Sequence, residues 1–212
     1  MIRTKDHLVR AIAEELVWRR KELTQLRGMI QVLDGEIKSK VLIRSAVALL
    51  YAHWEGFVKK SGGYYLEYVA AQRLTYSQLA PNFVALSLKG KFSQLAKSDG
   101  ITMANSIANH FCLEMESRSL LPYRKGLETR SNLSSTVLVE ILNTLGLPKS
   151  SFATRFHFID SKLVDKRNHI AHGEFLEISD DDYLLIHDEV IILLELFRTE
   201  IENSAALDNF RR

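Results

Sequence analysis

A short polar stretch at residues 165–174 brings together the side chains best suited to chemistry. It places Arg167, Asn168, His169 and His172 within one and a half helical turns. Arginine is a fixed cation whose planar guanidinium binds phosphate oxygens in pairs. Histidine has an ordinary pKa of about 6.5, so it can take up or release a proton near neutrality. The stretch therefore supplies a phosphate clamp and a proton carrier, which together can cleave a phosphodiester without a metal.

Two other interpretations of this stretch remain open. Basic residues favour the last turn of a helix because the helix dipole is negative there, and Gly173 is a natural stop, so the residues could simply end a helix. Spacing alone favours that interpretation. A metal site could instead use His169 and His172, with His157 or Glu174 as a further ligand. The spacing fits no zinc pattern, so we expect no metal and no cofactor.

The order of residues in three blocks points to a family. Arg167 and His172 are separated by four residues, with Asn168 directly after the arginine, and this resembles the Arg-x(4–6)-His signature of the HEPN family. The flanking sequences resemble one bacterial HEPN nuclease branch in the same order and over most of the chain. They are LVDKRNHIAHGE (163–174), LLYAHWEGFVK (49–59) and TRSNLSSTVLVEILNTLGL (129–147).

The resemblance implies a metal-independent endoribonuclease. The ribose 2′-OH would attack the phosphate, leaving a 2′,3′-cyclic phosphate and a 5′-OH end, and DNA would be inert. His172 would act as general base or acid, and Arg167 would hold the phosphate. Asn168 would help to position Arg167 or the phosphate by hydrogen bonding. His169 is expected to orient or pack.

The resemblance also implies a homodimer with a composite active site at the interface. This suits a site of one arginine and one histidine, which is sparse in a single subunit. It further suggests a toxin or defence effector, restrained by an antitoxin or other regulatory protein. Alternatives are a non-catalytic HEPN module that binds nucleotide or RNA, and an interaction protein of a toxin–antitoxin pair.

The elements that must position these residues are all helical. No stretch alternates with period two, and we predict an all-α bundle of four or five main helices with a helical excursion at about 74–127. The first helix covers 4–34 and is capped by Thr4. The second covers 38–60, and its apolar face holds Val47, Leu50, Tyr51, Trp54, Phe57 and Val58. We expect a kink or break at 61–63, because glycine disfavours a helix interior, and a short helix from there to about 73.

Further helices are predicted from apolar spacing and from capping signals. Apolar residues at spacings of four indicate one from about 102 to 118, and another is capped by Asn132 or Ser134 and ends at Gly146. The motif helix covers 158–172. The last helix begins with a capping box at Ser179 and runs to about 203.

Arg167 and His172 lie about 140° apart on a regular helix, so they converge only if the helix ends or loosens at 171–173. Glu55 on the second helix has two interpretations: an ion pair with Lys59, or a partner that orients a residue of the site. Ala48, Ala52 and Gly56 form a strip of small residues that another helix could approach closely, within or between subunits.

Composition sets the remaining expectations. The net charge of +2 is too weak to predict nucleic-acid binding, so any basic footprint must be local, and the charged cluster at 19–21 is expected on a solvated face. The lone Cys112 is expected to be a buried apolar residue in a reducing compartment. We see no signal peptide and no uncharged run of ~20 apolar residues, so we predict one cytoplasmic domain over 1–212 and no membrane partner. Residues 1–3 and 205–212 are expected to fray.

Overall fold

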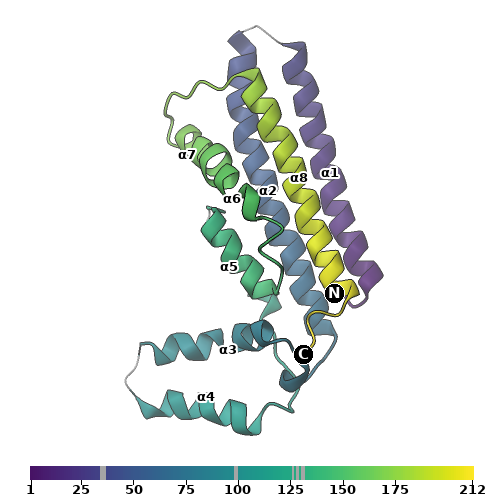
Figure 1. Cartoon of the computed structure of the whole chain (residues 1–212), viewed down its shortest axis with the longest axis vertical. Helices are drawn as coiled ribbons and strands as arrows, with labels where there is room; N and C mark the ends of the chain where they lie inside the picture. The colour runs from purple at the N-terminus through teal and green to yellow at the C-terminus, as the bar shows by residue number, and fades with distance from the viewer. Residues whose placement is uncertain (34–36, 98–99, 126, 128, 130–131) are drawn as a thin grey trace.

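Three long helices pack side by side and form the body of the molecule (Figure 1): α1 (Lys5–Val32), α2 (Ile37–Ala71) and α8 (Asp180–Ala206). The computed structural model describes residues 1–33, 37–97, 100–125, 127, 129 and 132–212. Local capping starts two of these helices as predicted. The Thr4 side chain accepts a hydrogen bond from the His7 amide at 3.2 Å, and the Ser179 side chain accepts one from the Asp182 amide at 3.1 Å.

The predicted break in the second helix is wrong, because α2 runs without interruption through Ser61, Gly62 and Gly63. Gly62 is there for packing. A Cβ at this position would collide with Cδ1 of Leu127 and lie 3.1 Å from Cδ1 of Leu145. Gly63, by contrast, has open space beside it. The cost of a glycine inside a helix is therefore offset at Gly62 by the close approach of two leucines.

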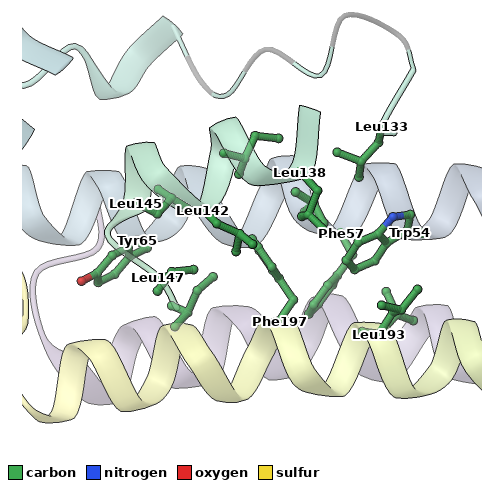
Figure 2. Close-up of a cluster of buried hydrophobic side chains, with 14 of the residues drawn as sticks. Trp54, Phe57, Tyr65, Leu133, Leu138, Leu142, Leu145, Leu147, Leu193 and Phe197 are labelled. Carbon is green, nitrogen blue, oxygen red and sulfur yellow. The ribbon is translucent and has the colours of Figure 1, made fainter. Parts of the chain in front are cut away.

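A second layer covers one side of α2 and carries the 165–174 stretch. It contains α5 (Ser135–Leu145), the 3₁₀ turn η3 (Ala153–Arg155), α6 (Phe156–Phe158), the π-helical segment η4 (Ile159–Val164) and α7 (Asp165–Ala171). Figure 2 shows how this layer joins the bundle, with leucines of α5 and its flanks meeting aromatic side chains of α2 and α8. Trp54, Phe57 and Phe197 are fully buried there, and their rings meet edge to face.

Ser134 is the N-cap of α5, and Gly146 ends it with a φ of 69°. Asn132, the other candidate cap, does not have that role. Arg130 and Ser131 of the block at 129–147 lie outside the described residues.

The excursion forms a hairpin at one end of the bundle, near both chain termini (Figure 1). It contains η1 (Tyr76–Gln78), α3 (Pro81–Leu95), α4 (Ile101–Leu113) and η2 (Tyr123–Lys125). The helix predicted to reach residue 118 thus ends at Leu113. Cys112 is exposed on α4, so the expectation that it is buried is wrong.

The C-terminal residues are docked rather than frayed. Phe210 is fully buried, and its carbonyl accepts a hydrogen bond from the Ala80 amide at 2.9 Å. The Arg212 amide donates to the Gln78 carbonyl at 3.0 Å. Ile2 is also buried at the other terminus. Both ends are held because their apolar side chains find partners in the excursion and the bundle, which local sequence could not indicate.

One member of the charged cluster at 19–21 is also buried. Arg19 is 6% exposed, lies over the ring of Trp18 and pairs with Glu15 at 2.9 Å. Arg20 and Lys21 are exposed as predicted. The Arg19 guanidinium occupies the space in front of Gly56, where a Cβ would lie 3.1 Å from Nη1. The small-residue strip is therefore approached within the subunit at Gly56, whereas Ala52 is exposed.

The all-α prediction is confirmed: within the described ranges the only β-type pairings are two isolated bridges. One helix, Lys38–Ala71, is long and apolar enough to cross a membrane by length and composition alone. Half of its most apolar window is buried inside the bundle, as in the core helix of a globular protein.

Candidate functional site

The 165–174 stretch ends a helix, and the end has a defined geometry. α7 stops at Ala171, His172 is its cap, and Gly173 follows with a φ of 75°. The Glu174 amide donates to the His169 carbonyl at 3.0 Å, and the Gly173 amide donates to the Ile170 carbonyl at 3.1 Å. These two bonds form a Schellman motif, for which a glycine is best suited. The helix therefore ends at residues 171–173, where an end was expected to let Arg167 and His172 converge.

Before α7, the chain makes a π-helical segment at Ile159–Val164. A π-helical turn rotates every later side chain relative to an unbroken α-helix and is frequent at functional sites. The apolar side chains of this segment still face the core, since Ile159, Leu163 and Val164 are all buried. Asp160 instead points outward to α5, where its carboxylate accepts hydrogen bonds from the Ser135 amide at 2.7 Å and the Ser135 hydroxyl at 2.5 Å.

Arg167 is half-buried and lies flat on an aromatic side chain. Its guanidinium carbon is 3.9 Å from the centre of the Tyr51 ring, and its Nη1 donates to Oδ1 of Asn168 at 2.9 Å. A cation over an aromatic face is attracted by about 0.5–2 kcal/mol, depending on how far it is desolvated. The Tyr51 ring from α2 and the side-chain amide of Asn168 therefore both hold the guanidinium.

Tyr51 is itself fixed. It is 3% exposed, and its hydroxyl accepts a hydrogen bond from the Leu133 amide at 2.6 Å. Burial raises the pKa of Tyr51 above its usual value, although the hydrogen bond from the Leu133 amide and the neighbouring Arg167 guanidinium act in the opposite direction. The phenol is therefore neutral at physiological pH.

Glu55 lies one helical turn after Tyr51 on α2, and the predicted ion pair with Lys59 is present. Its carboxylate is 3.0 Å from Nζ of Lys59, and it accepts a very short hydrogen bond from the Thr129 hydroxyl. Burial raises the pKa of Glu55, but the hydrogen bonds from Thr129 and Lys59, helped by Tyr51, outweigh it and hold the pKa below its usual value. Glu55 is thus an anion that ties Thr129 to α2, the helix that carries Tyr51.

The two histidines differ in their surroundings. His169 lies between two carboxylates: Nδ1 contacts Glu174 at very short range, and Nε2 is 3.6 Å from Asp165. His172 is exposed at the end of the helix. Beyond it, Arg44 of α2 donates to the Glu174 carbonyl at 2.8 Å and the Leu176 carbonyl at 3.3 Å. Arg44 therefore fixes the chain that leaves His172.

The metal interpretation finds no support in the side-chain positions. Within the described part of the chain, no group of three or more histidine, cysteine, aspartate or glutamate side chains could hold an ion. His169 already has two carboxylate partners, which fits an orienting role better than a ligand role.

Sequence reasoning had not identified three residues of this site: Tyr51, Arg44 and Asp160. Tyr51 was assigned to the apolar face of its helix, and it does lie there. The available signal was its place four residues before Glu55, which puts both side chains on one face. Arg44 and Asp160 gave no local signal, because their partners are distant in sequence.

The three sequence blocks that suggested a family meet at this site. Tyr51 and Glu55 come from the first, Thr129 and Leu133 from the second, and Arg167 from the third. A family model described as RiboL-PSP-HEPN matches residues 14–203. The chain therefore belongs to this HEPN family, a class of nuclease or RNA-related modules. No curated protein and no solved structure matches the chain.

Proposed function

We propose that this protein is a metal-independent endoribonuclease whose site is built on Arg167, Asn168 and His172. The observation that carries the proposal is the arrangement at the end of α7. A guanidinium is held on the Tyr51 ring by fixed partners, and an exposed imidazole follows at the helix cap. His169 and Glu55 support the site, His169 by fixing the turn through Glu174 and Glu55 through Thr129.

The reaction needs only these groups and the RNA. His172 takes the proton of the ribose 2′-OH, and the oxygen attacks the adjacent phosphorus. The bond from phosphorus to the 5′ oxygen breaks, and that oxygen takes up a proton from an imidazolium. The products are a 2′,3′-cyclic phosphate and a 5′-OH end. A positioned acid or base contributes about 10²- to 10⁴-fold, and Arg167 stabilises the charge that develops on the phosphate.

The proposal includes a homodimer in which two motif helices share one cleft. One imidazole would then act as base and the imidazole of the other subunit as acid. Two exposed apolar side chains near this helix support a face that a second subunit would cover. They are Ala52 on α2 and Phe175, which is 89% exposed and lies three residues after His172. Mixing wild-type subunits with an excess of His172→Ala subunits after partial unfolding should lower cleavage per wild-type subunit, because each mixed dimer lacks one imidazole of the shared cleft. Cleavage per wild-type subunit that stays constant would exclude the shared cleft.

In the cell, the proposed role is that of a cytoplasmic toxin or defence effector that acts on cellular RNA. An antitoxin or another regulatory protein would restrain it, because uncontrolled RNA cleavage harms the producing cell. Induced expression tests this role. Wild-type protein should arrest growth and shorten cellular RNA, whereas His172→Ala should do neither. Normal growth at high wild-type levels would contradict the role.

Cleavage is tested by incubating purified protein with RNA and with DNA of the same sequence in excess chelator. Wild type should cut RNA alone, and Arg167→Ala and His172→Ala should lose at least 10²-fold in rate. His157→Ala is the matched control, because His157 is exposed in the same segment and should retain full activity. RNA left intact by wild type, but bound through Arg167, would favour a non-catalytic RNA-binding module instead. A His172→Ala variant that lost only stability would favour an interaction protein.

A further inference from the structure

Tyr51 of α2 contacts Arg167 of α7, although it is not part of the Arg-x4-His motif. Tyr51 is neither exposed nor within the 165–174 stretch, and sequence placed it in the core. Yet its ring face is covered by the Arg167 guanidinium at 3.9 Å, while its hydroxyl is anchored to the Leu133 amide at 2.6 Å. One buried side chain therefore connects Arg167 to the segment that precedes α5.

We infer that Tyr51 is the positioning residue for Arg167, a platform that fixes the plane of the guanidinium for a phosphate. This inference rests on the proposed function for its consequence in catalysis, but the geometry can be tested separately.

The choice of a phenol has a physical reason. A carboxylate beside Arg167 would orient it equally well but would neutralise the charge that the phosphate needs. A neutral aromatic ring orients the guanidinium and leaves its charge intact. The carboxylate of Glu55, one turn further along the same helix, is engaged by Lys59 and Thr129. The contact with Tyr51 therefore adds no negative charge beside Arg167.

Stacking also fixes direction. When the guanidinium lies on a ring, its N–H groups point outward in a plane parallel to that ring, so rotation about the last side-chain bonds is restricted. Asn168 takes one N–H of Nη1 and sets the rotation within the plane. The ring restricts rotation of the guanidinium out of that plane, and its loss should misplace the phosphate clamp. Misplacement by about 1 Å can cost about 10²-fold in rate.

Two substitutions separate the ring from the hydroxyl. Tyr51→Phe keeps the platform and removes the bond to Leu133, and Tyr51→Leu removes both. We expect kcat to stay within about threefold of wild type in Tyr51→Phe and to fall about 10- to 100-fold in Tyr51→Leu. The matched control is Tyr68→Leu. It truncates an equally buried tyrosine of the same helix, whose ring meets Phe210 instead of Arg167, and should leave kcat unchanged.

A direct readout does not depend on cleavage. In NMR spectra, the Arg167 Hε resonance should lie upfield of exposed arginines in wild type and Tyr51→Phe, because the ring shields it. Arg167→Lys assigns the signal by removing it. If the wild-type resonance is unshifted, or if Tyr51→Leu keeps both the shift and kcat, Tyr51 is not the platform. A shifted resonance in a protein that cleaves no RNA would refute the proposed function while upholding the platform.

Discussion

Arg167 and Glu55 have opposite charges and lie on facing helices, yet different partners hold each. Arg167 has the ring of Tyr51 and the amide of Asn168, whereas Glu55 has Lys59 and Thr129. At the scale of residues, this division holds Glu55 as an anion through its own partners, while the guanidinium of Arg167 lies on an uncharged ring.

Glu55→Gln tests this division through pH. The folded pKa of Glu55 lies below its usual value, so its contribution to stability is present above the unfolded pKa of 4.5 and is lost as pH falls through the folded pKa. At pH 7 the variant should be less stable by about 1–3 kcal/mol, since hydrogen bonds to a charged group are lost. The difference should shrink in acid. Urea unfolding at pH 7 and near pH 3.5 measures it, and an equal difference at both pH values would contradict the assignment.

The elements show which features can be predicted from sequence. The caps at Thr4, Ser179, Gly146 and Gly173 were predicted correctly, and Ser134 was one of two candidates, because a cap depends on residues three or four positions away. The end of the motif helix was predicted for the same reason, whereas the π-helical segment at Ile159–Val164 was not predicted. By contrast, the break expected at Gly62 is wrong, because the reason for that glycine is Leu127, far along the chain. Tyr51 was missed on the same grounds, since its role depends on Arg167.

Two adjacent glycines of α2 provide a test at this scale. Gly63→Ala should raise the free energy of unfolding by up to about 1 kcal/mol, because alanine favours a helix and nothing lies within 4 Å of the new Cβ. Gly62→Ala gains the same helix propensity but collides with Leu127 and crowds Leu145, so it should be the less stable of the two variants. Thermal unfolding of both variants decides the matter. Equal stability would mean that Leu127 does not pack on Gly62.

At the scale of the molecule, the excursion at 74–125 and the chain ends stabilise each other. Phe210 packs edge to face on Tyr68 of α2, and its backbone pairs with Ala80, just before α3. The frayed tail expected from sequence is therefore a structural part of the base of the bundle. The site lies on the layer around α7, away from this end of α2 (Figure 1). Changes to the tail should thus alter stability without altering the chemistry of the site.

Phe210→Ala should lower the free energy of unfolding by about 3–5 kcal/mol, as for other buried phenylalanines. Leu207→Ala is the matched control, since Leu207 is 72% exposed and should change stability by less than about 0.5 kcal/mol. Chemical unfolding of the two variants measures both effects. A Phe210→Ala protein as stable as wild type would show that the tail is not docked in solution.

The most direct test of the central claim maps the ends that the protein leaves on a pool of random-sequence RNA in excess chelator. The account predicts 2′,3′-cyclic phosphate and 5′-OH ends from wild-type protein, with His172→Ala producing at least 10²-fold fewer at equal concentration and equal stability. Cuts that carry a 5′-phosphate, or a His172→Ala variant that cuts as fast as wild type, would contradict it.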